Sequence, residues 1–238
     1  MSSSAQSAVR LRGVIFDMDG VLVDSHPVHR KAWRIFLQTM GRTVTDAELN
    51  FILDGRKRSD ILTHFLGNLP QEELERHGQR KDAIFRRMHL EVAPIAGAVR
   101  LVHELHKAGM GLALATSASR SRVDSTLIQL GLEDCFSAIV TGDDVSLGKP
   151  DPAIYRAACG QLAVDPSCGL AVEDAVSGIE AATRAGLGCI GVASNQPAEK
   201  LAEAGAMHVV QDFSGLSAAT LEEILHHSES AVSANAKH

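Results

Sequence analysis

Short apolar segments alternate with helical segments along most of this chain, and that alternation limits the possible folds more than any other feature. Each apolar segment is short and nearly continuous, as in strands that are buried on both faces of a parallel sheet. The segments between them have helical periodicity and can cover those faces. Strands are predicted at residues 11–16, 111–115, 138–141, 169–172, 188–192 and, more weakly, 208–210; helices are predicted at residues 98–108, 120–130, 152–162, 178–185 and 198–204. The pattern predicts an α/β fold with a Rossmann-like parallel sheet core.

The segment from residue 27 to residue 91 interrupts this alternation, because it has helical periodicity and no convincing strand. Trp33 and Phe36 recur at helix spacing. We expect Trp33 to pack in the core of this segment, with a ligand contact as the alternative. Thr45 and Glu48 form a capping-box pattern, which predicts the start of a further helix. The segment is therefore predicted to be a small all-helical cap, inserted after the first strand.

The chain of 238 residues divides accordingly. Residues 10–26 and 92–227 are predicted to form an α/β catalytic core, and residues 27–91 the helical cap. The two ends, residues 1–9 and 228–238, contain small and polar residues and are predicted to be disordered. We expect the cap to close over the core on hinges near residues 25–27 and 92–97.

Charge and composition exclude several classes of partner. The formal net charge of −6 argues against nucleic acid, whose phosphate backbone requires a basic surface. No uncharged segment reaches the roughly 20 apolar residues of a membrane span, and the N-terminus has no secretory signal pattern. The four cysteines form no C-x-x-C pair, so reduced thiols in a cytoplasmic protein are expected. With only 4% aromatic residues, no interface stands out, and a monomer is the default expectation.

Polar side chains follow the predicted strands at the points where the strands end. In an open parallel sheet, ligands bind beyond these carboxyl ends. Four carboxylates, one lysine and two hydroxyls should therefore meet at one edge of the sheet. These residues are Asp17, Asp19, Thr116, Ser117, Lys149, Glu173 and Asp174. Clustered acids repel one another, so the site needs a cation, and oxygen ligands suit Mg²⁺. A lysine beside a metal also suits a phosphate group.

The same residues carry a resemblance to a known family. The segment D-M-D-G-V-L-V-D from Asp17 to Asp24 resembles the first motif of the haloacid dehalogenase-like hydrolase superfamily. Thr116 in L-A-L-A-T-S-A-S resembles the second motif, Lys149 in G-K-P-D-P the third, and V-E-D-A-V-S-G at Asp174 the fourth. The motifs occur in the family's order over almost the whole chain. The branch that it resembles contains β-phosphoglucomutase, phosphoglycolate phosphatase and sugar phosphatases, which carry a helical cap after the first motif.

The resemblance and the chemistry imply the same roles in catalysis. Asp17 would be the nucleophile that forms an aspartyl-phosphate, and Asp19 the general acid and then the general base. Mg²⁺ would be held by Asp17, the backbone carbonyl of Asp19 and Asp174, with Glu173 assisting directly or through water. Lys149, together with the metal, would neutralise the charge of the transferring phosphoryl group.

The groups that would bind the phosphoryl oxygens come from the second motif. They are Thr116 and the backbone amides of Ser117 and Ala118, near the start of the following helix. Thr116 as a simple cap of that helix and Glu173 as a structural acid remain alternatives.

The cap is expected to decide the substrate. Arg58 matches a cap arginine that grips the far phosphate of the substrate in the mutase, and a solvated charge is the alternative. His29 matches a histidine that touches the substrate and the acid/base aspartate, and an ordinary exposed histidine on a helix is the alternative. Asp54 replaces a cap lysine of the mutase, and Ser25 replaces its hinge threonine. Both departures weaken a mutase interpretation, since a mutase must hold a bisphosphate while it reorients.

These observations predict a Mg²⁺-dependent phosphatase that hydrolyses a small phosphorylated metabolite, with a sugar or polyol phosphate favoured. A phosphosugar mutase of the β-phosphoglucomutase type is the alternative, and a non-catalytic binding module is a third. Dehalogenation is disfavoured, because Asp19 supplies a proton that a halide leaving group does not need.

Overall fold

A parallel sheet forms the centre of the computed structural model, which describes residues 10–88 and 91–235. In this part of the chain the sheet has six strands in the order β5-β4-β1-β6-β7-β8, and all the pairings are parallel. The strands are β1 (Gly13–Phe16), β4 (Gly111–Ala115), β5 (Ala138–Val140), β6 (Gly169–Glu173), β7 (Gly188–Val192) and β8 (His208–Val210). The predicted α/β fold with a Rossmann-like parallel sheet is therefore confirmed.

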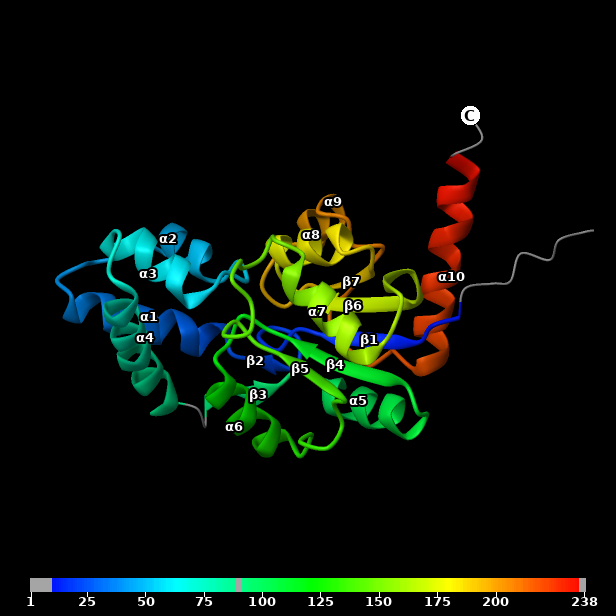
Figure 1. The fold of residues 1–238 in the computed structure, drawn as a ribbon, viewed down its shortest axis with the longest axis horizontal. Helices are drawn as coiled ribbons and strands as arrows, with labels where there is room; N and C mark the ends of the chain where they lie inside the picture. Colours follow the sequence, from blue (N-terminus) through cyan, green and yellow to red (C-terminus); the bar gives the residue numbers. More distant parts are fainter. Residues whose placement is uncertain (1–9, 89–90, 236–238) are drawn as a thin grey trace, which may run out of the picture.

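Helices cover both faces of this sheet (Figure 1). They are α5 (Ala98–Lys107), α6 (Arg120–Leu130), α7 (Ala153–Leu162), α8 (Val176–Arg184), α9 (Ala198–Glu203) and α10 (Ala218–Asn235). Alternate strand residues point to opposite faces, as strand geometry requires. Val14 and Phe16 of β1 pack with side chains of α5, α6 and α10, whereas Ile15 packs with those of α7, α8 and α9. Burial on both faces explains why the strands are almost continuously apolar.

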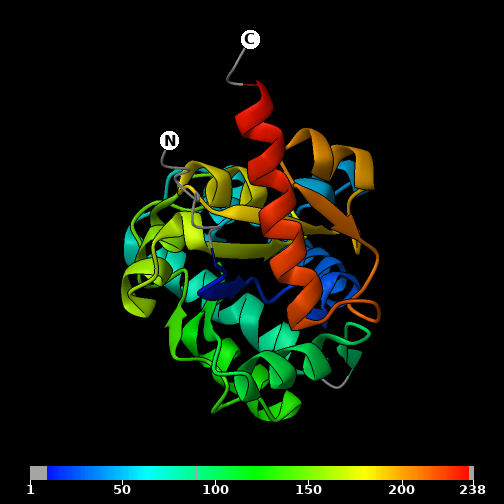
Figure 2. The same cartoon turned by 90° about the vertical axis from the view of Figure 1, so that its right-hand side faces the viewer.

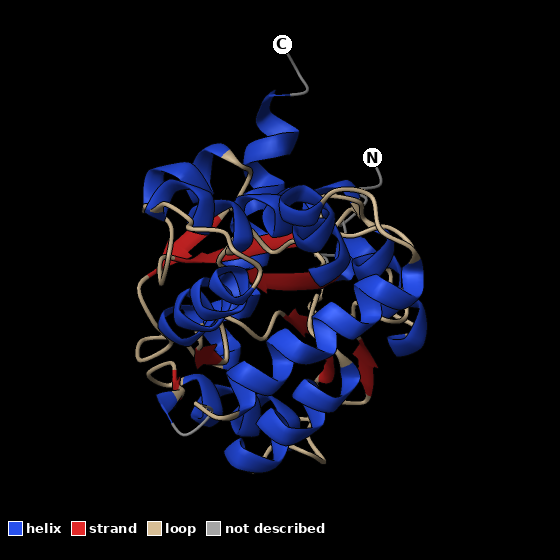
Figure 3. Ribbon diagram, turned by 90° about the vertical axis from the view of Figure 1, so that its left-hand side faces the viewer, coloured by secondary structure: helices blue, strands red, loops and turns tan. Residues whose placement is uncertain are grey.

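The segment after the first strand forms four helices: α1 (His26–Thr39), α2 (Asp46–Ile52), α3 (Arg58–Leu66) and α4 (Gln71–Arg86). They lie beyond the carboxyl end of β1, at the left of Figure 1 and at the front of Figure 3. We call them the cap. The predicted capping box at Thr45 and Glu48 begins α2. Two short strands, β2 (Val23–Asp24) and β3 (Ala93–Pro94), pair antiparallel where the chain enters and leaves the cap.

The cap has an apolar core of its own, separate from the two cores of the sheet. Trp33, Phe36 and Leu37 of α1 pack there against side chains of α2 and α3. Trp33 is only 2% exposed, so its predicted place in the cap core is confirmed, although it also borders the cavity described below.

This cap core gives a first prediction, on stability. We expect Phe36→Ala to lower the free energy of unfolding by about 3–5 kcal/mol, because Phe36 is fully buried and the truncation leaves a cavity. The neighbouring residue Ile35 is 38% exposed and is the matched control. Ile35→Ala should change stability by less than about 1 kcal/mol. Chemical denaturation of both variants measures the two effects, and equal losses would contradict the assignment of Phe36 to the core.

The C-terminal part of the chain differs from its prediction. The helix α10 continues to Asn235, so residues 228–235 are helical where the sequence predicts disorder. Leu221 and Leu225 anchor the start of this helix in the core of the sheet, and elongation of an existing helix is easier than starting one. Figure 2 shows the last turns of α10 projecting beyond the sheet. Residues 1–9 and 236–238, also predicted to be disordered, lie outside the described residues.

Two smaller expectations concern the membrane and the cysteines. Among the described residues, no helix combines the length and apolar character that a membrane crossing requires. Cys135, Cys159 and Cys189 are buried, Cys168 is partly buried, and all four are free.

Candidate active site

The carboxyl ends of β1, β4 and β6 bring the predicted acids and the predicted lysine together. Asp17 directly follows β1, Glu173 is the last residue of β6, and Asp174 follows it. All three carboxylates are buried, and one oxygen atom from each lies within 4.8 Å of the others. Lys149 reaches the same point from the loop before α7 and is also buried. Strand ends that are distant in the sequence therefore build one charged cluster at the edge of the sheet.

Lys149 holds this cluster together. Its Nζ atom lies 2.7 Å from Oδ1 of Asp17 and 2.5 Å from Oε1 of Glu173, and it also donates to the carbonyl of Ala115. The hydroxyl of Tyr155 donates to the same Glu173 oxygen at 2.6 Å. Burial raises the pKa of Asp17 to about 8, although the Lys149 charge opposes the rise. Glu173 thus holds Lys149 in place. This is the structural role that the sequence analysis gave as the alternative to metal binding.

Asp174 has a histidine partner that sequence reasoning missed. Nε2 of His26 lies 2.6 Å from Oδ2 of Asp174, and both side chains are buried. Burial alone would lower the pKa of His26, but the Asp174 carboxylate outweighs burial and the pKa rises. The glycine of the first motif belongs to the same arrangement. Gly20 has φ of +74°, and a Cβ there would lie 2.1 Å from Oδ2 of Asp174. Only glycine therefore lets the turn pass so close to the carboxylate.

Asp19 is held by residues from both parts of the molecule. Arg122 in the first turn of α6 donates from Nη1 to Oδ1 at 2.6 Å and from Nη2 to Oδ2. The hydroxyl of Ser25 donates to Oδ1, and Nε2 of His29 lies 3.5 Å from that oxygen. Burial would raise the pKa of Asp19, but Arg122 and His29 hold it well below its ordinary value. Asp19 is therefore a carboxylate in this arrangement.

The second motif lies beside these acids, and two of its side chains already form hydrogen bonds within the protein. The side chain of Thr116 accepts a hydrogen bond from the Ala118 amide at 3.3 Å, so it does organise the turn before α6. The hydroxyl of Ser117 donates to the carbonyl of Gly55 in the cap at 2.6 Å. Thr116, Ser117 and Ala118 all line the cavity.

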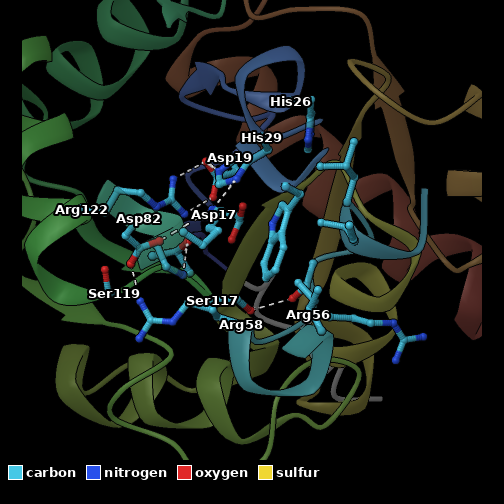
Figure 4. Close-up of a pocket in the computed structure, with 18 of the residues that line it drawn as sticks. Asp17, Asp19, His26, His29, Arg56, Arg58, Asp82, Ser117, Ser119 and Arg122 are labelled. Carbon is cyan, nitrogen blue, oxygen red and sulfur yellow. Dashed lines mark hydrogen bonds and ion pairs between the residues drawn. The ribbon is translucent and has the colours of Figure 1, made fainter. Parts of the chain in front are cut away.

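The cap supplies the opposite wall of the site (Figure 4). Arg58 forms an ion pair with Asp82 of α4. His29 lies over the ring of Phe85, with 4.4 Å between ring centroids, and its Nδ1 atom is 3.0 Å from Nζ of Lys81. Burial and the Lys81 charge lower the pKa of His29 to about 3, so this ring is neutral. Burial likewise lowers the pKa of Lys81 to about 7.

The loop between α2 and α3 joins the cap to the core by four hydrogen bonds that involve side chains. The Ser117 bond to Gly55 is one, and the hydroxyl of Ser177 donates to the carbonyl of Asp54. The third runs from Nζ of Lys57 to the carbonyl of Val145 at 2.6 Å. In the fourth, Oδ1 of Asp54 accepts from the backbone amide of Ser177 at 3.4 Å. Asp54, which the sequence singled out as a departure from the mutase, therefore fastens this loop to the start of α8.

Between the core and the cap lies a cavity that is partly open to solvent. Of the predicted site residues, Asp17, Asp19, Asp174, Thr116, Ser117, Ala118, Arg58 and His29 line it. Lys149 and Glu173 lie behind Asp17. Five titratable residues that were not predicted also line the cavity: His26, Arg56, Lys81, Asp82 and Arg122.

A Rossmann-like sheet with buried acids and a lysine at its carboxyl edge, closed by a helical cap, defines a class of phosphate-ester hydrolases. Comparison with known proteins agrees with this class and identifies the family within it. The sequence model of the haloacid dehalogenase-like hydrolase family matches residues 11–186. The chain belongs to this family.

Relatives of known activity include several phosphatases. Validoxylamine A 7'-phosphate phosphatase from Streptomyces hygroscopicus subsp. limoneus is 34% identical over 191 residues, which cover 80% of this chain and 89% of that protein. A phosphorylated carbohydrates phosphatase from Thermotoga maritima is 34% identical over 204 residues, covering 84% and 94%. The crystal structure of β-phosphoglucomutase from Clostridium difficile superimposes with a TM-score of 0.81 at 25% identity, covering 92% and 98%. The family and these relatives support a phosphatase that hydrolyses phosphate esters.

Proposed function

We propose that this protein is a Mg²⁺-dependent phosphatase of small sugar or polyol monophosphates, with Asp17 as its nucleophile. One observation carries the proposal: the Asp17 carboxylate lies 2.7 Å from Lys149 at the base of a cavity that the cap closes. The phosphatase relatives named above act on validoxylamine A 7'-phosphate and on phosphorylated carbohydrates, according to their names. Their similarity supports the same substrate class here.

The donor set fits a hard divalent cation. Asp17, Glu173 and Asp174 offer three buried carboxylate oxygens within 4.8 Å of one another, and carboxylate oxygen is the ligand that Mg²⁺ prefers. We assign the metal to Asp17, Asp174 and the backbone carbonyl of Asp19, with Glu173 assisting. When bound, Mg²⁺ would neutralise negative charge on the phosphoryl group.

The protein's own residues divide the reaction into two displacements. In the first, an oxygen of Asp17 attacks phosphorus, the bond to the substrate oxygen breaks, and Asp19 gives its proton to the leaving alkoxide. In the second, Asp19 takes a proton from water, which attacks the aspartyl-phosphate and releases inorganic phosphate. The carboxylate form of Asp19 suits this second step. For the first step, its contacts with Arg122 must loosen so that it can hold a proton.

Phosphate release from a panel of metabolites tests the proposal. The panel contains hexose phosphates, β-glucose 1-phosphate, glycerol phosphates and phosphoglycolate, each assayed with Mg²⁺ and with EDTA. We expect release from at least one sugar or polyol monophosphate, reduced by EDTA at least about 100-fold, since the phosphoryl charge is then unbalanced. Conversion of β-glucose 1-phosphate to glucose 6-phosphate with a bisphosphate primer, without phosphate release, would instead identify a mutase. The absence of Mg²⁺-dependent release from every compound would refute the phosphatase.

A further inference from the structure

The helix α4 carries a slot that is shaped for the side chain of Arg58. Gly78 and Asp82 lie one turn apart on this helix. A Cβ at Gly78 would lie 2.4 Å from Nε of Arg58, so the guanidinium lies directly against the bare backbone of α4. One turn further, Asp82 pairs with Nη1 of Arg58 and is itself only 8% exposed. The pair is thus held in a fixed place on the cavity wall (Figure 4).

The other cations around the cavity also lie close to carboxylates. Nζ of Lys81 lies 3.7 Å from Oδ1 of Asp82, and Arg122 is paired with Asp19. Arg56 has a nitrogen 3.6 Å from Oδ2 of Asp54 and lies over the ring of Phe51. Arg56, Arg58, Lys81 and Arg122 are the cations that line this cavity in the described part of the chain, and each has a carboxylate within 4 Å. On the cap side three cations face two carboxylates: Arg58 and Lys81 share Asp82, and Arg56 lies beside Asp54, so each lining cation there already has a carboxylate neighbour.

The rest of the cap wall is apolar. Trp33, Ile52, Leu53 and Ile61 border the cavity and belong to the cap core. Such a wall suits the carbon face of a polyol or a ring, whose hydroxyl groups can contact the paired charges at its edge. A second phosphate group would meet the buried Asp82 carboxylate, and it would have to displace that carboxylate from Arg58. Like charges brought together in a partly desolvated site cost several kcal/mol.

We propose that Asp82 is a specificity-determining residue that restricts the site to monophosphates whose far end is uncharged, and that it excludes bisphosphates. This inference rests on the proposed function, because it takes the phosphate to bind at Asp17. It assigns to the Arg58–Asp82 pair the opposite role from the one that the resemblance implied for Arg58 alone. Arg58 is expected to contact hydroxyl groups as part of a neutral pair, and not to grip a far phosphate.

Binding to a protein that cannot turn over tests this role separately from catalysis. In the Asp17→Asn background, with excess Mg²⁺, calorimetry measures the dissociation constants of glucose 6-phosphate and glucose 1,6-bisphosphate, and of fructose 1-phosphate and fructose 1,6-bisphosphate. We expect each monophosphate to bind at least about tenfold more tightly than its bisphosphate. Adding Asp82→Asn should bring the two within about threefold, because the repelling charge is gone and Arg58 is freed.

Two further variants serve as controls. Asp82→Glu retains the charge and should retain the preference, and Glu72→Gln removes an acid from the same helix outside the cavity and should leave it unchanged. Three results would overturn the inference. The Asp17→Asn parent could bind mono- and bisphosphates equally, or it could bind neither. The ratio of the two dissociation constants could also stay unchanged in an Asp82→Asn protein that melts cooperatively. The parent ratio decides the question even if Asp82→Asn does not fold. Hydrolysis is scored on the protein with Asp17 intact, so its absence would refute the proposed function and leave the binding ratio to decide the role of Asp82.

Discussion

Asp17→Asn is expected to lower phosphate release by at least about 10⁴-fold while leaving the fold intact, which is the largest effect that the site predicts. An amide cannot attack phosphorus as a carboxylate does, and every later step depends on the covalent bond at this atom. The replacement has nearly the same shape, and Asn can still accept a hydrogen bond from Lys149. Steady-state release of inorganic phosphate from the best compound of the panel measures the loss.

The matched control is Asp124→Asn, on an exposed face of α6, where the acid pairs with Arg120. This change should alter the rate by less than about twofold, because surface ion pairs contribute little. Chemical trapping gives a second readout, since a phosphorylated protein should be detected by mass spectrometry after a rapid acid quench of the parent and not of Asp17→Asn. An Asp17→Asn protein with a tenth of the parent activity would show that another group is the nucleophile.

The second large effect is expected for Lys149→Met, with a loss of about 10²–10³-fold in kcat. Lys149 places a fixed positive charge against Asp17, so its removal takes away charge stabilisation of the transferring phosphoryl group. It also leaves Asp17 and Glu173 as two buried acids without their shared cation. Breaking a buried ion pair on one side typically costs about 3–5 kcal/mol, so the variant should also melt at a lower temperature.

Activity and stability have to be separated in this case. The rate is measured well below the melting temperature of the variant, and Lys149→Arg serves as the charge-preserving comparison. Lys200→Met, a change in the short helix α9 outside the site, should leave both rate and melting temperature near those of the parent. A folded Lys149→Met protein that retains more than about a third of the parent kcat would contradict the assignment of Lys149 to charge stabilisation.

The core of the site could be predicted because its signals are local in the sequence. Asp17, Thr116 and Asp174 each follow an apolar strand directly, and parallel strands bring their carboxyl ends to one edge. The strands themselves could be found because burial on both faces makes them continuously apolar. The end of α10 was predicted wrongly, because small and polar residues were taken as a sign of disorder where an anchored helix extends through them.

The cap residues could not be predicted in the same way. Lys81 and Asp82 lie in a helix whose sequence, Q-E-E-L-E-R-H-G-Q-R-K-D, resembles a solvated charged face. Their burial depends on α1 and α3, which pack against α4 only in three dimensions. Arg122 lies in the first turn of α6 among other polar residues, and nothing near it in the sequence indicates Asp19 as its partner. His26 likewise reaches Asp174 across 148 positions of the chain.

The antiparallel pairing of β2 with β3 has a mechanical consequence. The chain crosses between core and cap twice, and at both crossings it passes through this one two-stranded ribbon, with Val23 opposite Pro94 and Asp24 opposite Ala93. If the two crossings were separate flexible connections, the cap could both rotate and slide relative to the core. A bonded ribbon ties them, so we expect the cap to rock about a single axis through the ribbon and to return to the same register after each opening. Every substrate would then contact Arg58, Asp82 and the apolar wall in one orientation relative to Asp17. Discrimination between substrates would therefore depend on the rigidity of the β2–β3 ribbon as much as on the side chains themselves.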